Sequence, residues 1–210
     1  MTQGIIVIGA GGHAKVCIEL LRDSRFHVAF CVGGADSATE CLGVPVLIGD
    51  EHLARLRLEG FEEIFVAIGS NSLRERLGMQ VAALGFRLVN AVSPQATVSP
   101  SARIGQGVAI MAGAVINADS RIGDLCIINT LASVDHDGDL ATAVHIAPHV
   151  ALAGNVSIGA RTFLGVGCKV IPEVEIGADS FAAAGSVITQ AIASHSRIAG
   201  VPAQPMRKPH

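Results

Sequence analysis

Three of the eight histidines in the sequence, His136, His145 and His149, lie close together along the chain. His136 stands between Asp135 and Asp137. When a carboxylate holds one ring nitrogen of a histidine in a hydrogen bond, it fixes the tautomer and makes the other nitrogen a better base. The pattern therefore predicts a general base at His136. The alternative is a solvated polar corner without a catalytic role.

These histidines fall within a six-residue repeat that fills the second half of the chain. Every sixth residue from Val98 to Ile188 is apolar, sixteen in succession, and all but Ala182 are Val, Ile or Leu. The residue four positions after each of them is small or β-branched. Hexapeptide repeats of this kind indicate a parallel β-helix. Each repeat supplies one short strand and a corner, three repeats make one coil, and about five coils are expected.

Both repeating positions are expected to point into a narrow interior that has no room for Trp or Tyr, and the sequence contains neither. The three histidines fall on neither position and should point outward, with Asn129 near them in one polar place. Glycine recurs at one corner of most coils, and we attribute this to the unusual backbone angles of a corner. These glycines are Gly105, Gly123, Gly159 and Gly177.

Zinc is an alternative use for the histidines, because some hexapeptide-repeat proteins resemble carbonic anhydrases with three histidines on zinc. The spacings of nine and four residues place His136, His145 and His149 at different points around one coil. The five cysteines also lack the spacing of metal ligands, and we expect them to be reduced thiols. We therefore expect no metal.

Composition excludes several classes of protein. Half of the residues are apolar and the mean hydropathy is +0.51, which excludes disorder. No apolar run reaches the roughly 20 residues of a spanning helix, and the first residues do not resemble a signal peptide. The net charge of −3 without a basic stripe argues against nucleic acid as a partner. We expect a cytoplasmic protein that does not contact membranes.

The first half of the chain alternates strands and helices, as in a small parallel sheet flanked by helices. The predicted strands cover residues 5–8, 28–32, 64–68 and 87–92, and the predicted helices cover 14–22, 51–58 and 73–84. We therefore expect an α/β, Rossmann-like domain over residues 1–92 and the β-helix domain, with a C-terminal tail, over residues 93–210.

The motif Gly9-x-Gly11-x-x-Ala14 follows the first predicted strand and opens the first helix, as in a dinucleotide-type fingerprint. Its glycines let the backbone approach phosphate oxygens, and the helix N-terminus supplies donors. The alternative is a turn that needs glycine for its geometry alone. A nicotinamide-dependent enzyme is disfavoured, because the second strand ends at Gly33 without an acidic residue and no substrate domain is left.

Several motifs in their order along the chain resemble the sugar O/N-acetyltransferase family. This family includes bacterial sialic-acid O-acetyltransferases and the N-acetyltransferases of nucleotide-linked 4-amino-4,6-dideoxy sugars. The motifs are Gly9–Val16, Ala67–Asn71 with Arg74, Asn129-Thr130, Val134–Asp137, Ala153–Asn155 and Gly200–Ala203. The resemblance implies an N-terminal domain that holds a nucleotide sugar. It also implies a left-handed parallel β-helix that forms a homotrimer and holds acetyl-CoA between subunits.

The roles that the resemblance implies fall on matching positions of this chain. His136 is the implied general base, Asp137 is the acid that orients it, and Asn129 lies near the sugar. The other implied substrate-binding residues are Gly9, Gly11, Gly12, His13, Asp36, Ser70, Asn71 and Arg74. The implied acetyl-CoA-binding residues are His145, Gly154, Val166, Ala184, Gly200 and Pro202. Relatives often carry an acidic residue where Gly33 stands, and Asp36 is the candidate to replace it.

The expected reaction is direct transfer of the acetyl group of acetyl-CoA to the 4-amino group of such a sugar. GDP-perosamine or a UDP-linked analogue is the expected substrate, in polysaccharide (O-antigen) biosynthesis. His136 would remove a proton from the amine, and a backbone N–H near Gly154 would stabilise the oxyanion. The alternatives are O-acetylation of a sialic-acid-like sugar and a non-catalytic scaffold that binds nucleotide sugars.

Outward apolar residues predict that the β-helix packs against further copies of itself, because contiguous exposed apolar area marks an interface. The residues expected to be exposed in a monomer are Val115, Ile127, Leu131 and Val166. Threefold packing would set His136 of one subunit against the His145 or Gly154 region of the next. After the last coil come three basic residues, one of which is expected to meet a phosphate of CoA: Arg197, Arg207 and Lys208.

Overall fold

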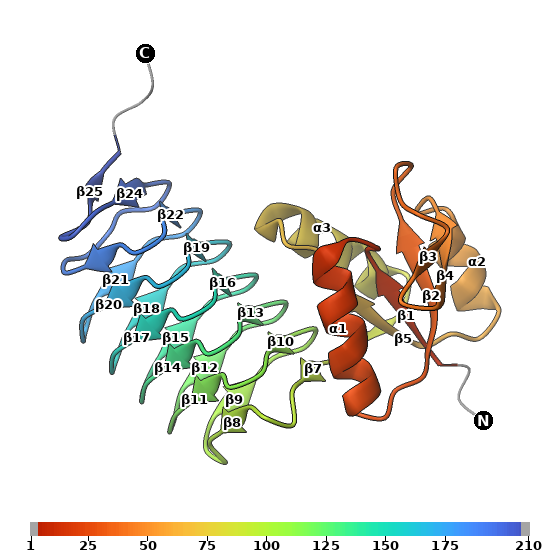
Figure 1. Cartoon of the computed structure of the whole chain (residues 1–210), viewed down its shortest axis with the longest axis horizontal. Coiled ribbons are helices and arrows are strands. Elements are labelled where there is room, and N and C mark those ends of the chain that lie inside the picture. The colour runs from red at the N-terminus through yellow and green to blue at the C-terminus, as the bar shows by residue number, and fades with distance from the viewer. Residues whose placement is uncertain (1–3, 207–210) are drawn as a thin grey trace. The chain divides into compact units, whose positions relative to one another are not determined.

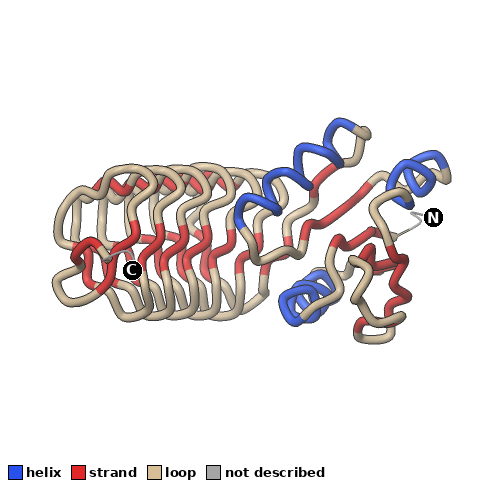
Figure 2. Tube along the Cα trace, turned by 90° about the horizontal axis from the view of Figure 1, so that it is seen from above, coloured by secondary structure: helices blue, strands red, loops and turns tan. Residues whose placement is uncertain are grey.

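The computed structural model describes residues 4–206 of the 210-residue chain. The chain divides after Pro94 into two compact units, which are apparent as separate bodies of secondary structure in Figure 1. The first unit combines three helices with a sheet. The second is a coil of short strands whose successive turns lie in rows (Figure 2).

The sheet of the first unit is almost entirely parallel. In spatial order it contains β3 (Glu40–Cys41), β4 (Val44–Ile48), β2 (Val28–Gly33), β1 (Ile5–Ile8), β5 (Glu63–Val66) and β6 (Arg87–Leu88). Only β3 and β4 pair antiparallel. The helices are α1 (Gly12–Asp23), α2 (His52–Leu58) and α3 (Asn71–Ala83). This alternation of parallel strands and helices confirms the predicted α/β class.

Two parts of the prediction for the first unit are wrong. Residues 40–48 form the hairpin of β3 and β4, which the predicted strands do not include. Pro45 lies within β4, and proline argues against a strand except near a sheet edge. The predicted strand over residues 87–92 is two short strands, β6 and β7 (Ala91–Val92). By contrast, β1 covers the predicted residues, and all four of them are buried.

The second unit is a left-handed parallel β-helix with three faces. The first face contains β8 (Thr97–Val98), β11 (Val115–Ile116), β14 (Ser133–Val134), β17 (Ala151–Leu152), β20 (Lys169–Val170) and β23 (Val187–Ile188). The second face contains β9 (Arg103–Ile104), β12 (Arg121–Ile122), β15 (Asp139–Leu140), β18 (Ser157–Ile158) and β21 (Glu175–Ile176). The third face contains β10 (Ala109–Ile110), β13 (Ile127–Ile128), β16 (His145–Ile146), β19 (Phe163–Leu164), β22 (Phe181–Ala182), β24 (Arg197–Ala199) and β25 (Gln204–Pro205).

The interior of the β-helix confirms both repeating positions. Every sixth residue from Ile110 to Ile188 is buried, and so is every sixth residue from Val108 to Ser186. From β8 to β20, each strand pairs in parallel with the strand eighteen residues later, so that equivalent side chains stack from coil to coil. Cys126 and Cys168 are fully buried in this stack, and neither thiol faces the surface where an acyl group could be received.

The recurring corner glycines have a cause different from the predicted one. From Ile104 to Ala182, positive φ falls instead on the residue three positions after each inward residue, for example Asp119 and Asp137. A Cβ at Gly159 would lie 2.3 Å from the backbone nitrogen of Ala178 in the next coil. At the other three glycines it would lie 2.3 to 2.8 Å from a backbone atom of the next coil. Close stacking of the coils therefore excludes a side chain at Gly105, Gly123, Gly159 and Gly177.

Candidate functional site

His136 lies at the corner between the first and second faces, in the turn that joins β14 to β15. Its Nδ1 is 2.8 Å from Oδ2 of Asp137, and its backbone N–H donates to Oδ1 of Asp135 at 2.8 Å. Asp137 has a φ of +57°, the left-handed conformation of this corner position. The amide of Asn117, one coil earlier, donates to the same Asp135 oxygen at 3.0 Å. The Asp137 carboxylate therefore holds the exposed imidazole, as the sequence predicts, while the Asp135 carboxylate binds the His136 backbone.

These contacts shift the pKa values of His136 and Asp135. The hydrogen bond to Asp137 raises the pKa of His136 above its usual value, with smaller contributions from the charges of Asp135 and Asp137. The His136 backbone N–H and the Asn117 amide lower the pKa of Asp135, which stays ionised. With Nδ1 held by Asp137, the Nε2 atom of the neutral ring is the one available to accept a proton.

Gly154 lies directly beside the His136 ring, one coil further along the same corner. A Cβ on Gly154 would lie 2.5 Å from both Cε1 and Nε2 of His136. The neighbouring Asn155 N–H donates to the His136 carbonyl at 2.9 Å, which ties the two coils together. Within residues 4–206 no protein acceptor is recorded for the Gly154 N–H. The corner thus offers a base and a backbone donor side by side.

Asn129 and His145 form a second polar group. The Asn129 side-chain amide donates to Nε2 of His145 over 3.2 Å, while its Oδ1 accepts from the Thr130 N–H at 2.8 Å. The edge-to-face contact of His145 with Phe163, at 5.0 Å between ring centroids, holds the imidazole on the third face. These contacts fix the ring with its Nε2 as an acceptor.

The expectation of one polar place is wrong for a single chain. His136 occupies the corner between the first and second faces, whereas His145 lies on the third face and Asn129 follows a strand of that face. Nine residues correspond to one and a half repeats, so residues separated by nine cannot share a face. His149 is exposed at the corner between the third and first faces and joins neither group.

The predicted nucleotide loop lies between β1 and α1. Gly9 has a φ of +115°, and a Cβ there would lie 2.6 Å from the carbonyl oxygen of Ala67. Backbone conformation and local packing therefore require glycine at this position. Gly11 and Gly12 border open space at the N-terminus of α1. Burial, with a smaller effect of Arg74, lowers the pKa of His13 to about 4, so this ring is neutral at physiological pH.

The second predicted loop precedes α3. Ser70 is exposed at the N-cap of α3, and Asn71 begins the helix. Arg74 is only 1% exposed, and its guanidinium donates to the carbonyl of Ile68 at 2.9 Å and to Oδ1 of Asn71 at 2.9 Å. The structure therefore gives Arg74 the role of positioning this loop rather than of facing a ligand.

Asp36 lies in the exposed turn after β2. A Cβ on Gly33 would lie 2.5 Å from Oγ of Ser37. Any side chain at position 33 would therefore collide with Ser37 in this conformation. Asp36 is the first acidic residue after the end of β2 along the chain, and it is exposed.

The remaining predicted acetyl-CoA residues lie in two places. Val166, 51% exposed, and Ala184 occupy equivalent positions of successive coils at the corner between the third and first faces. Gly200 and Pro202 are exposed after β24. Arg197 projects from β24 with its guanidinium carbon 4.5 Å from the centre of the Phe181 ring. Arg207 and Lys208 lie outside the described residues.

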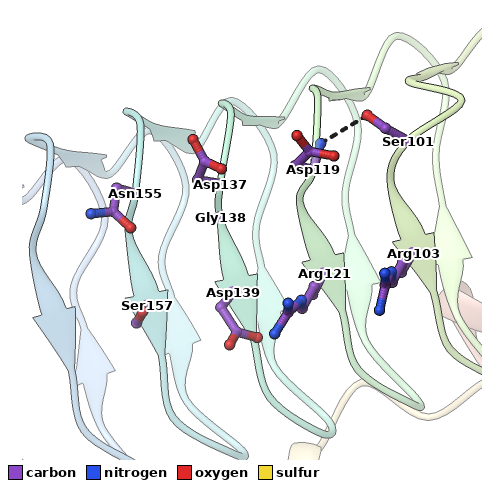
Figure 3. A pocket seen from close by; sticks show the side chains of 9 residues that line it. All are labelled: Ser101, Arg103, Asp119, Arg121, Asp137, Gly138, Asp139, Asn155 and Ser157. Atoms are coloured by element: carbon purple, nitrogen blue, oxygen red, sulfur yellow. Dashed lines mark hydrogen bonds between the residues drawn. The ribbon is translucent and has the colours of Figure 1, made fainter.

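A polar groove that is not among the predicted sites runs along the second face and its corner with the first (Figure 3). Its volume is about 440 Å³, and Asp137 is part of its wall. The lining residues are Ser101, Arg103, Asp119, Arg121, Asp137, Gly138, Asp139, Asn155 and Ser157. The signal that predicts it is a spacing of eighteen residues between polar residues, which places Arg103, Arg121 and Asp139 on neighbouring strands.

In the described part of the chain, no group of three or more His, Cys, Asp and Glu side chains is arranged to hold a metal ion. Over the same residues, no helix combines the length and apolar character needed to cross a membrane.

Known proteins resemble the chain over nearly its whole length. Residues 4–81 match the family described as the PglD N-terminal domain. A mutant of perosamine N-acetyltransferase from Caulobacter crescentus, in complex with CoA and GDP-perosamine, is 52% identical, with 98% of this chain and 97% of that chain covered and a TM-score of 0.95. The acetyltransferase domain of PglB from Neisseria gonorrhoeae, in complex with acetyl coenzyme A, is 40% identical, with 98% and 100% covered and a TM-score of 0.91.

Curated relatives match over shorter stretches. The serine acetyltransferase of Salmonella typhimurium is 31% identical over 131 residues, which is 60% of this chain and 44% of that protein. The chain spans less than half the length of such curated relatives.

Proposed function

Since the chain belongs to the sugar O/N-acetyltransferase family, with perosamine N-acetyltransferase among its relatives, we propose that it acetylates an amino sugar. The acetyl group comes from acetyl-CoA, and the acceptor is the 4-amino group of a nucleotide-linked 4-amino-4,6-dideoxy sugar, such as GDP-perosamine or a UDP-linked analogue. The observation that carries this proposal is the His136 imidazole held by Asp137 against the backbone of Gly154.

The reaction uses the corner as follows. The amine nitrogen attacks the thioester carbonyl carbon while Nε2 of His136 accepts a proton from that amine. The Gly154 N–H donates to the oxygen that becomes negatively charged. The carbon–sulfur bond then breaks, the amide forms, and CoA leaves as a thiolate that is protonated by the His136 imidazolium. No residue is acetylated on the way.

A thiol-release assay across a panel of acceptors tests the proposal. Nucleotide-linked 4-amino sugars with GDP and with UDP should release CoA, whereas the corresponding hydroxy sugars should not. Release with sialic-acid-like hydroxyl acceptors alone would favour O-acetylation. Binding of nucleotide sugars without thiol release from any donor would favour the non-catalytic scaffold.

The raised pKa of His136 predicts a characteristic pH dependence. A protonated ring cannot accept a proton, so kcat/KM should rise with pH through a midpoint above 6.5. Asp137→Asn removes the main cause of the raised pKa, so the midpoint should move to lower pH. Profiles of kcat/KM against pH for both proteins measure the shift. A midpoint that stays in place would contradict the role given to Asp137.

The proposed assembly is a homotrimer with each site shared between two subunits. Support comes from the separation of the two polar groups, because His136 and His145 lie on different parts of the β-helix surface. Leu131 and Val166 are 52% and 51% exposed, as expected of interface residues. Ile127 is the exception, since it is 1% exposed and cannot contribute the outward surface predicted for it. Val115 is half-buried.

A mixing experiment tests whether sites are shared. His136→Ala and His145→Ala should each be nearly inactive alone. If one subunit supplies His136 and its neighbour His145, random co-assembly of equal amounts should restore about a quarter of the wild-type sites. Thiol release after joint refolding or co-expression measures this, and light scattering should report three 21.5 kDa chains. No gain on mixing, or a fully active monomer, would refute the shared site.

We further propose that the protein works in the cytoplasm. All five cysteines are free and buried, which suits a reducing compartment. Fractionation of cells followed by detection of the protein tests this location. Recovery in the periplasmic fraction would contradict it.

A further inference from the structure

The corner between the first and second faces recurs in successive coils, and Asp119, Asp137 and Asn155 occupy the same position of it (Figure 3). The Asp137 N–H donates to the carbonyl of Ala118 at 3.0 Å, and the Asn155 N–H donates to the carbonyl of His136 at 2.9 Å. These bonds tie each of the two corners to the coil before it. The N–H of His136 takes no part in them, because its acceptor is a side chain.

That acceptor is the carboxylate of Asp135. Its Oδ1 accepts from the His136 N–H at 2.8 Å and from the side-chain amide of Asn117, one coil earlier, at 3.0 Å. Hydrogen bonds to an ionised group are shorter and stronger than those between neutral groups. Asp135 therefore gives the His136 backbone a second connection to the preceding coil, beside the one that the Asp137 N–H makes.

The fold does not require this contact. The equivalent position of the other coils holds Ser99, Asn117, Ala153 and Ile171. At these four described positions no side chain is recorded as an acceptor for the N–H that follows it. Asn117 donates to Asp135 instead, and Ala153 has no polar side-chain atom, which leaves the Gly154 N–H open. An acidic side chain thus stands at this position only in the coil that carries His136.

Asp137 and Asp135 hold different parts of His136. Asp137 binds Nδ1 and so orients the ring, whereas Asp135 binds the backbone from which the ring projects. We propose that Asp135, fixed by Asn117, is a positioning residue that sets the place of the His136 ring beside Gly154, an inference that rests on the role of His136 as the base proposed above. The His136 side chain is 61% exposed, so packing contributes little to its position. A displacement of ~1 Å in a catalytic group is enough to lose much of its effect.

Steady-state kinetics of three variants test the assignment. Asp135→Ala should lower kcat by about tenfold with little change in either KM, because the His136 backbone loses a charged hydrogen bond. Asp135→Asn keeps an oxygen acceptor without the charge and should restore kcat to within about threefold of the wild type. Asn117→Ala leaves the carboxylate in place but free to turn, and should lower kcat by about threefold. The charge of Asp135 raises the pKa of His136, so both Asp135 variants should also move the midpoint of kcat/KM to lower pH.

Asp124→Ala is the matched control. Oδ1 of Asp124 accepts from the Gln106 N–H at 2.8 Å, so this exposed carboxylate also binds a corner amide, but at the corner between the second and third faces. Its loss should lower the melting temperature as Asp135→Ala does, yet leave kcat within about twofold of the wild type. The double variant Asn117→Ala/Asp135→Ala should be no slower than Asp135→Ala, since Asn117 acts through Asp135. A slower double variant would contradict that route.

An NMR measurement on the resting protein is independent of catalysis. One Hα of Gly154 points where a Cβ would lie, 2.5 Å from Cε1 of His136, so the wild type should show a nuclear Overhauser effect between this proton and the Cε1 proton. The effect should be lost in Asp135→Ala and persist in Asp135→Asn and Asp124→Ala. Circular dichroism should show that all of them are folded.

The outcomes separate this inference from the proposed activity. If the wild type acetylates amino sugars but Asp135→Ala keeps its kcat and its Overhauser effect, the positioning role is overturned while the activity stands. If the Overhauser effect depends on Asp135 but no acceptor is acetylated, the positioning stands and the proposed activity fails. Equal losses in Asp135→Ala and Asp135→Asn would assign the effect to charge and overturn the role of the hydrogen bond. Absence of the Overhauser effect in the wild type also overturns the assignment.

Discussion

Replacing His136 with alanine should lower turnover by about 10²–10⁴-fold, the usual contribution of a positioned general base. The side chain is 61% exposed and lies off both inward positions, so its removal leaves the core of the β-helix unchanged. Single-turnover thiol release at saturating acetyl-CoA and sugar measures the loss. Circular dichroism and light scattering should match the wild type.

His195→Ala is the matched control for this variant. His195 is also an exposed histidine of the β-helix, 76% exposed and 4.0 Å from Oδ2 of Asp179, but it lies in neither polar group. Its replacement should leave turnover within about twofold of the wild type, since surface substitutions away from the two polar groups have small effects. Near-normal turnover of His136→Ala would refute the assignment of the base.

The interior of the β-helix is predictable from the sequence because strand and corner repeat every six residues without an insertion. A phase that starts at Val98 therefore assigns the large inward side chains, all of which are buried from Ile110 to Ile188. The same arithmetic distinguishes the face of His136 from that of His145. The prediction of one polar place failed because it took closeness along the chain for closeness in space, although nine residues change the face.

The other incorrect predictions concern glycine, Arg74 and Pro45, whose structural roles a single sequence does not determine. Glycine is required either where φ is positive or where a Cβ has no room. Only the short distance between a Cβ placed on Gly159 and Ala178 in the next coil reveals that the second reason applies there. Arg74 was expected to meet the substrate, but its burial depends on how α3 packs and on the carbonyls of the preceding loop. The strands β3 and β4 are absent from the prediction because Pro45, which lies within β4, argues against a strand.

Gly154→Ala should reduce turnover by about a hundredfold, because the added methyl group displaces the His136 ring. A displacement of ~1 Å in a catalytic group can cost this much. Gly154 does not have a positive φ, so alanine fits its backbone, and its N–H is retained. The new Cβ, however, would lie 2.5 Å from Nε2 of His136, and the exposed ring must move away. The melting temperature should therefore change little while catalysis falls. Gly34→Ala, which places its Cβ in open space, is the control and should be fully active.

The double variant Gly154→Ala/His136→Ala separates this explanation from loss of the backbone donor. If the methyl group acts only by displacing the imidazole, it has nothing left to displace once His136 is alanine. The double variant should then be no slower than His136→Ala alone, a non-additive result expected of residues in direct contact. A further loss in the double variant would mean that Gly154 contributes separately, through its N–H or through space for the thioester. Full activity of Gly154→Ala would mean that the ring does not stand beside Gly154 during turnover, and the corner would then have to rearrange before it could act as a base.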